Sequence, residues 1–246
     1  MRKSNAGMRV WRRCLAGKRP WPGLRQLDKA ISILSVNVGL PKIIGTVHGE
    51  PVLSGIGKHA VAADEVFVGL TNIAGDGQAD LDVHGGIDKA VYAYPSEHWP
   101  WWAREKGLVC APATFGENLT LAGADENEVR IGERFRWRGA LLEISQPRAP
   151  CFKLAIHTKR PDVPQAMTAS SRCGWYLRVI ADGTAPVRGA TLVREARGQG
   201  PTVREAFAAL FSTAFDVAAL RRIHAAPALS EAWRQALDKK IAAFPG

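Results

Sequence analysis

The stretch VRIGERFRWRGALLEI, residues 129–144, alternates apolar with charged side chains. Successive side chains of an extended chain point to opposite faces, so Phe135 and Trp137 share one face. The opposite face carries three arginines: Arg134, Arg136 and Arg138. Gly139 marks a turn, after which residues 142–144 begin a second arm. The stretch therefore predicts two adjacent strands, each with one buried face.

Short apolar runs of the same kind recur along the chain. They lie at residues 31–40, 43–47, 65–70, 90–94, 175–180 and 190–194. Asp182-Gly183 is a turn signal between the last two runs. Residues 95–106 predict a short helix, which Pro100 either divides or delays to a later start. Many short strands with few helices predict a mainly β (α+β) fold, either a barrel or a sandwich. The lack of a β-α-β alternation argues against a doubly wound nucleotide-binding fold.

After residue 200 the pattern changes to helical periodicity. Thr202-x-x-Glu205 is a capping-box pattern before an apolar helical face. Asp216 and Ser230 can each cap a further short helix. Helices this short are not stable alone in water, so they must pack on one another, on the β domain or on a partner.

The formal net charge is +10, and it is unevenly distributed. Residues 1–30 hold nine Lys/Arg and one Asp, whereas residues 31–200 hold 18 basic and 18 acidic side chains. This distribution disfavours a protein whose main domain binds nucleic acid. The basic segment lacks the apolar run of about 7–15 residues of a secretory signal. No stretch of about 18 apolar residues predicts a membrane span.

We therefore expect three parts in the chain. These are a disordered basic tail at residues 1–30, a β domain at 31–198 and a three-helix subdomain at 199–246. The helical subdomain is a candidate for docking an electron donor or for forming a homodimer.

The four cysteines form no C-x-x-C pair and match no zinc spacing. Without a secretory signal we expect free thiols and a cytoplasmic location. Cys151 lies between Arg148 and Lys153 in the proline-stiffened stretch SQPRAPCFKL, residues 145–154. Two nearby cations favour the thiolate, the form that binds soft metals or attacks electrophiles. The alternative is a buried, apolar cysteine with a structural role. The other three cysteines, Cys14, Cys110 and Cys173, lack this cationic setting, and we expect them to be structural or incidental.

The densest polar cluster is DLDVHGGIDKAVYAYPSEH, residues 80–98. Gly85 and Gly86 allow positive φ and close approach of the backbone to a ligand, with amides exposed to an anion. Asp88 and Lys89 follow and can orient or neutralise a charged ligand. One alternative is a solvated tight turn. Another is a metal site formed by three alternate side chains: Asp80, Asp82 and His84.

A shorter motif, FGENL at residues 115–119, reads as a turn. Glu117 offers an acceptor and Asn118 an amide beside Gly116. The motif is weak alone because Gly-Glu-Asn is common in loops.

In this order, the clusters resemble the MOSC domain, the C-terminal module of molybdenum-cofactor sulfurases. The matching elements are VHGGIDKAVYAYPSEHW, FGENL, the IGERF to EISQPRAPCFKL stretch and GWYLRV. The resemblance covers residues 31–246 and is strongest to bacterial stand-alone MOSC proteins that confer resistance to 6-hydroxylaminopurine. In those proteins a three-helix domain follows the barrel.

The resemblance implies a β-barrel that binds the molybdenum cofactor, a molybdopterin with a phosphate, and not pyridoxal phosphate. It implies that Cys151 is the sulfur ligand to molybdenum. It also implies reduction of small N-hydroxylated compounds, including hydroxylaminated purines, as a detoxification. The electrons would come from a separate reductase.

Roles for the other residues follow as hypotheses. The phosphate needs cationic and amide donors, which Arg148, Lys153 and the Gly85-Gly86 turn can supply. We count Asp88, Lys89 and Asn118 among the cofactor-binding residues too. His84 is a candidate proton donor because its unperturbed pKa is near 6.5.

Two other functions stay open at this point. A sulfur-carrier or cofactor-handling module would carry a persulfide on Cys151 without turning over small substrates. A binding module would recruit a partner through its helices and leave the barrel inert.

Overall fold

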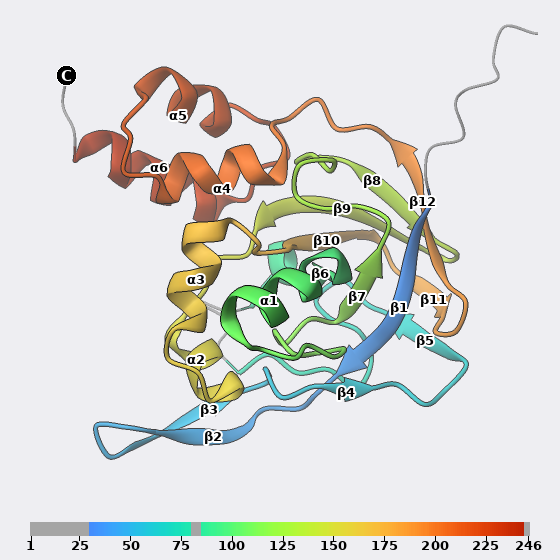
Figure 1. The fold of residues 1–246 in the computed structure, drawn as a ribbon. Coiled ribbons are helices and arrows are strands. Elements are labelled where there is room, and N and C mark those ends of the chain that lie inside the picture. The colour runs from blue at the N-terminus through green and yellow to red at the C-terminus, as the bar shows by residue number, and fades with distance from the viewer. Residues whose placement is uncertain (1–29, 80–84, 244–246) are drawn as a thin grey trace, which may run out of the picture.

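The computed structural model describes residues 30–79 and 85–243, and within them a strand-rich part precedes three helices (Figure 1). The strands are β1 Ile31–Val38, β2 Lys42–Val47, β3 Glu50–Ser54, β4 His59–Ala60, β5 Glu65–Val68, β6 Val91–Pro95, β7 Leu119–Ala122, β8 Arg134–Trp137, β9 Ala140–Pro147, β10 Trp175–Ala181, β11 Gly183–Pro186 and β12 Thr191–Ala196. The helices are η1 Ile87–Lys89, η2 Ser96–His98, α1 Trp99–Lys106, α2 Phe152–Thr158, α3 Val163–Ser170, α4 Val203–Phe211, α5 Val217–His224 and α6 Glu231–Ala242. The predicted basic tail at residues 1–30 lies outside the described residues, except for Ala30.

Seven strands close into a barrel, in the order β12-β8-β9-β10-β6-β7-β1. The ring closes where β1 pairs antiparallel with β12, with Ile31 opposite Leu192. The short strand β4 extends the sheet on the free part of β1. A closed ring leaves few unpaired strand edges, and its inward-facing side chains form the core. The prediction of a mainly β fold with a barrel is confirmed.

The hairpin of β8 and β9 has the alternation that the sequence predicts. Phe135 and Trp137 are fully buried, whereas Arg134 lies on the outer face and pairs with Glu143 across the hairpin. Arg138, at the turn, has a positive φ of 50°. The apolar face of the hairpin therefore anchors two of the seven barrel strands.

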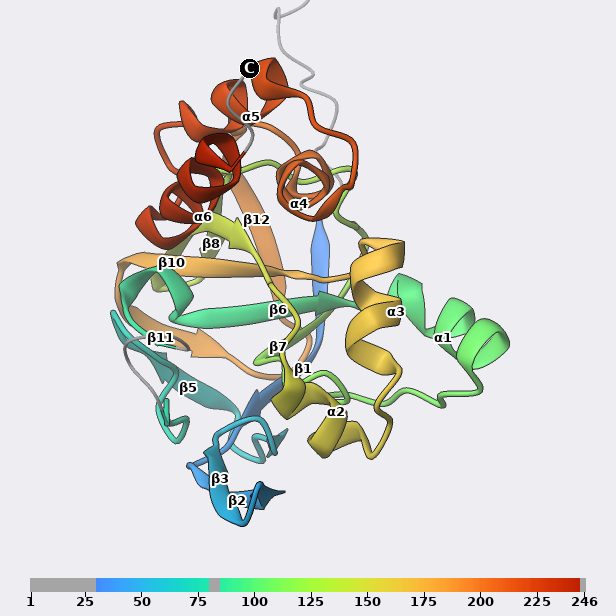
Figure 2. The same ribbon diagram turned by 90° about the vertical axis from the view of Figure 1, so that its left-hand side faces the viewer.

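One part of the ring differs from the sequence interpretation. Strands β6 and β7 are parallel, and η2 and α1 form the crossover between them (Figure 2). The helix starts late, with Pro100 in its first turn, where proline is tolerated. The sequence showed no β-α-β pattern because β7 begins at Leu119, the last residue of the FGENL motif, which was read as a turn.

Residues 43–47 form a strand as predicted, within β2, but the pairing of β2 with β3 was not predicted. The β2–β3 hairpin projects from the barrel, and α2 and α3, which were also not predicted, follow β9 (Figure 2). Asp182-Gly183 does not join β10 directly to β12, because β11 intervenes and pairs with β5, with Gly183 opposite Val68.

The three C-terminal helices begin at the predicted caps. Thr202 and Glu205 form a complete capping box, and Asp216 and Ser230 accept hydrogen bonds from the first turns of α5 and α6. The helices pack on one another and on the barrel, where the Ser230 hydroxyl donates to Gln146 Oε1 at 2.7 Å. Within the described ranges, no helix has the length and apolar character needed to cross a bilayer.

The capping box makes a stability prediction. Thr202→Ala removes the acceptor for the Glu205 amide, 3.1 Å away, and should cost about 1 kcal/mol of unfolding free energy. Urea unfolding of the purified protein measures the loss. The matched control is Thr213→Ala at an exposed bend, which should leave the free energy unchanged. Equal effects of both substitutions would contradict the role of the cap.

Candidate functional site

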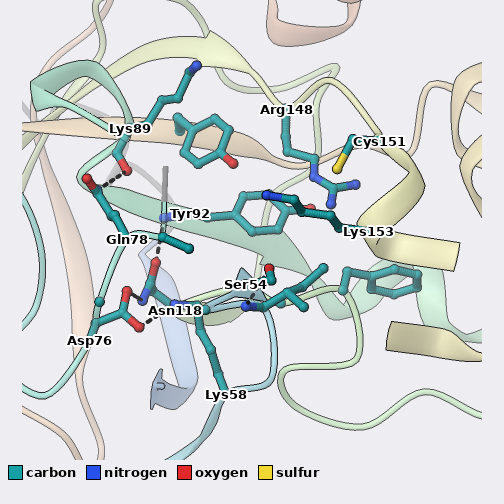
Figure 3. A pocket seen from close by; sticks show the side chains of 17 residues that line it. Ser54, Lys58, Asp76, Gln78, Lys89, Tyr92, Asn118, Arg148, Cys151 and Lys153 are labelled. Carbon is teal, nitrogen blue, oxygen red and sulfur yellow. Dashed lines mark hydrogen bonds and ion pairs between the residues drawn. The ribbon is translucent and has the colours of Figure 1, made fainter. Parts of the chain in front are cut away.

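The candidate site begins where the chain leaves the barrel wall at the end of β9. The backbone of Cys151 is extended, with φ −134° and ψ 171°, and the residue caps α2. Arg148 and Lys153 flank it, and Figure 3 shows all three side chains on one side of a cavity. These three residues, neighbours in sequence, therefore line the same cavity.

The cavity is open to solvent, and approximately 650 Å³ of space free of protein atoms, part of it continuous with bulk solvent, lies between its lining residues. Segments from across the chain line it: Ser54, Gly55, Ile56, Lys58, Asp76, Gly77, Gln78, Ala79, Lys89, Tyr92, Phe115, Gly116, Asn118, Arg148, Cys151, Lys153 and Tyr176.

Arg148 is a buried cation of this cavity, with 5% of its surface exposed. Its guanidinium lies 5.4 Å from the centre of the Tyr92 ring, and Nη1 donates to Met167 Sδ at 3.2 Å. No carboxylate of the described residues forms an ion pair with it. A buried charge without a counter-charge is costly, and an anionic ligand would offset that cost.

Most of the other charged side chains that line the cavity are also positive. Lys58, Lys89 and Lys153 line it with Arg148, whereas Asp76 is the single carboxylate among the described lining residues. Four cations against one carboxylate give a positive site. Such a site favours phosphate and other polyanions.

The wall opposite Cys151 is built around Asn118 (Figure 3). Its Nδ2 donates to Asp76 Oδ2 at 2.9 Å and to the Asn37 carbonyl at 3.1 Å, and its Oδ1 accepts from the Tyr92 amide at 3.0 Å. These bonds occupy the side-chain amide. Asn118 thus lines the cavity and holds three chain segments together, while its cofactor-binding role stays a prediction.

Glu117 is fully buried, where it organises the FGENL loop. Its carboxylate accepts from the amides of Ala113 and Phe115, at 2.8 and 3.0 Å, and from the Thr120 hydroxyl at 2.9 Å. Burial raises its pKa, and the hydrogen bonds oppose that rise. The motif is therefore a turn whose conformation the buried Glu117 side chain stabilises.

The described cysteines differ in their surroundings. Cys151 is half-buried and lines the cavity. Burial, with a smaller contribution from Glu117, raises the pKa of Cys110 to about 12. Burial also raises the pKa of Cys173 well above its usual value. Both remain thiols at neutral pH, which agrees with the structural role expected for them.

Some predicted residues lie elsewhere. Gly85 and Gly86 do not line the cavity, and the Gly86 amide donates to Gln78 Oε1 at 3.0 Å. Asp88 forms an ion pair with Arg178 at 2.8 Å and is also absent from the lining. Asp80, Asp82 and His84 are outside the described residues, so their suggested metal site and the His84 proton-donor role stay predictions. Residues 30–79 and 85–243 contain no cluster of three metal-ligating side chains.

The sequence interpretation missed several lining residues, notably Lys58, Asp76 and Tyr176. The glycines near Lys58 and Asp76 in the sequence were a possible signal that these two segments meet. A Cβ on Gly55 would lie 2.3 Å from the Gly77 carbonyl oxygen, so the two glycine-flanked segments must approach closely. Glycine pairs of this kind mark contacts between distant segments, although they do not identify the partner.

Comparison with known proteins agrees with this architecture. The MOSC domain family model matches residues 80–194, and the model of a YiiM-like, 3-alpha helix domain matches residues 201–244. The chain is 40% identical to the uncharacterized protein YflK of Bacillus subtilis over 210 residues, which cover 85% of this chain and 94% of YflK. It is 39% identical to protein YiiM of Escherichia coli over 209 residues, which cover 83% of this chain and 91% of YiiM.

Structural and more distant matches extend the comparison. The crystal structure of YiiM from Geobacillus stearothermophilus matches with a TM-score of 0.72 at 36% identity, covering 86% of this chain and 99% of that one. A reductase of Gibberella moniliformis is 34% identical over 122 residues, which are 48% of this chain but 22% of that protein. The barrel, the three helices and relatives of near-equal length lead to one conclusion: the chain belongs to the MOSC domain family and carries a YiiM-like three-helix domain at its C-terminal end.

Proposed function

We propose that this protein binds a molybdenum cofactor and uses it to reduce N-hydroxylated compounds such as hydroxylaminated purines. The principal support is the cavity, in which a thiol lies on the same wall as a buried guanidinium that forms no ion pair with a carboxylate of the described residues. Membership of the MOSC family and similarity to a reductase over part of the chain agree with it. The free thiols of the described chain suit a reducing cytoplasm, where we place the reaction.

The donor set fits such a cofactor. Soft sulfur ligands suit thiophilic transition metals, and Cys151 is the cysteine that lines the cavity. A cofactor phosphate would supply the negative charge that Arg148 lacks, with Lys153 and Lys89 close by on the same lining. When bound, the cofactor would supply two-electron reduction of the substrate N–O bond.

The chain's own residues would position the reaction. Cys151 would hold the metal and Arg148 the phosphate, while the Tyr92 ring keeps the guanidinium in place. Asn118 would keep the opposite wall at a fixed distance through its bonds to Tyr92 and Asp76. The reductase that delivers the electrons is a separate protein in this proposal. Cofactor-binding roles for Gly85, Gly86 and Asp88 stay predictions.

The first test compares Cys151→Ser with the wild type, both purified from a molybdenum-replete host. We expect near-stoichiometric molybdenum and pterin in the wild type and loss of molybdenum in Cys151→Ser, because serine offers no soft sulfur ligand. Reduction of 6-hydroxylaminopurine with a chemically reduced viologen should be lost as well. Metal analysis, pterin content and product formation measure the three effects.

The matched control is Cys110→Ser, which changes a thiol outside the cavity and should retain both metal and activity. Molybdenum retained in Cys151→Ser would contradict the assigned ligand. Absence of molybdenum from the wild type, together with labile sulfane sulfur on Cys151, would replace the proposal by the sulfur-carrier function.

A second test concerns the phosphate. Arg148→Met should weaken retention of the cofactor about tenfold or more, because a hydrogen bond to a charged group contributes about 1.5–3 kcal/mol. Pterin released from the denatured protein, measured after dialysis for increasing times, gives the retention. The control is Arg104→Met on the exposed face of α1. Equal retention in both variants would show that Arg148 does not hold the phosphate.

A further inference from the structure

The proposed reduction consumes protons as well as electrons. For a hydroxylamine the balance is R–NHOH + 2e⁻ + 2H⁺ → R–NH₂ + H₂O, with both electrons supplied by the separate reductase. The N–O bond breaks more easily if an acid protonates the departing hydroxyl. The inference below rests on the proposed function and asks which residue of the cavity is that acid.

Several lining groups are poorly suited to the task. Arg148 does not release a proton near neutral pH. The Tyr92 hydroxyl already donates to the Cys173 carbonyl at 2.8 Å, and burial raises the pKa of both Tyr92 and Tyr176. No histidine of the described chain lines the cavity. The remaining candidates are lysines.

Lys58 differs from the other two lysines of the lining. Only 8% of its side chain is exposed, and its partner is a carboxylate of the same lining. Its ammonium forms a close ion pair with Asp76, whose side chain is 4% exposed. Burial lowers the pKa of Lys58, and the charge of Asp76 opposes that effect. An ammonium withdrawn from water gives up its proton more readily than one in water.

Asp76 is itself held in one orientation. Its Oδ1 accepts from the Gly39 amide at 2.9 Å and its Oδ2 accepts from Asn118 Nδ2 at 2.9 Å. Because both oxygens have donors from the protein frame, the carboxylate cannot rotate to follow a mobile partner. The Lys58 ammonium is thereby kept at one point of the wall opposite Cys151 (Figure 3).

We propose that Lys58 is the proton donor of the reduction and that Asp76 is its positioning residue. The Lys58 ammonium gives one proton to the hydroxyl oxygen of the substrate, the N–O bond breaks and water leaves. The two electrons from the reductase remain on the nitrogen, which takes the second proton from solvent. Solvent then reprotonates the Lys58 amine.

The charges around Lys58 set its pH dependence. Asp76 and the buried Glu117 both raise its pKa electrostatically, although burial is the larger effect and lowers it. Lys42, whose side chain packs against Gly57, adds a cation on the same side. Only the protonated amine can act as the acid. The rate should therefore fall as pH rises through the pKa of Lys58, at a pH below the about 10.4 of an ordinary lysine.

The experiment uses full-length, cofactor-loaded protein and reduces 6-hydroxylaminopurine with reduced methyl viologen across the alkaline range. The variants are Lys58→Arg, which keeps the positive charge, and Lys58→Met, which serves if arginine does not fit. Each should retain molybdenum, lose about 100-fold or more of kcat and lack the alkaline fall of the wild type. The matched control, Lys239→Arg on exposed α6, should behave as the wild type does.

A second readout needs no turnover. In protein labelled with [¹⁵N]lysine and lacking cofactor, the Lys58 Nζ resonance should titrate below the exposed lysines. Asp76→Asn should lower that pKa further, because the carboxylate charge is removed. In loaded protein the same substitution should move the alkaline fall of the rate to lower pH.

The outcomes separate the two proposals. A wild type without molybdenum or without reduction overturns the proposed function, and the role of Lys58 with it. An active wild type whose Lys58 variants keep both molybdenum and rate overturns the proton-donor role alone. Loss of molybdenum in both Lys58 variants would make Lys58 a cofactor-binding residue instead. Loss of rate and of the alkaline fall in His84→Gln, with Lys58→Arg unaffected, would assign the acid to His84.

Discussion

The side-chain amide of Asn118 is the contact on which the cavity depends. It bonds to Asn37 in β1, to Tyr92 in β6 and to Asp76 in the loop after β5. These segments are far apart in sequence, and the amide bonds add to the backbone bond from the Gly77 amide to the Gly39 carbonyl at 3.0 Å. Because Asp76 in turn holds Lys58, the amide fixes the whole wall that faces Cys151. A buried amide with its bonds satisfied gives this wall a single arrangement.

The wall that carries Cys151 and Arg148 differs, because no described carboxylate balances the charge of Arg148. Asp76 neutralises Lys58, but no carboxylate of the described chain pairs with Arg148. Without a bound anion, the buried guanidinium lowers the free energy of unfolding. An anion that binds to it would remove this penalty, and it would also stabilise the fold because it binds the native state. The two walls of the cavity thus differ: the lysine of one has its counter-charge within the described protein, and the arginine of the other does not.

How much of this can be read from sequence depends on the range of each interaction. The β8–β9 hairpin and the three helix caps rest on residues a few positions apart, and each was predictable. The Arg148, Cys151 and Lys153 group was predictable for the same reason. Lys58 and Asp76 were not, because 18 residues separate them and no motif joins them. Parallel pairing of β6 with β7 depends on a crossover whose second strand follows a turn-like motif, so it also escaped prediction.

The three C-terminal helices are linked to the site by hydrogen bonds to β9. The Ser230 amide donates to the Ser145 carbonyl at 3.1 Å, and the Ser230 hydroxyl donates to Gln146. Arg178 on β10 donates to the Ala228 carbonyl at 2.8 Å. Ser145 and Gln146 lead directly through Pro147 into Arg148, so the cap of α6 is bonded to the last residues of the strand before the site loop. A shift of the helices would therefore move the end of β9, where the guanidinium and the thiol leave the barrel wall. The helices are thus part of the scaffold of the site.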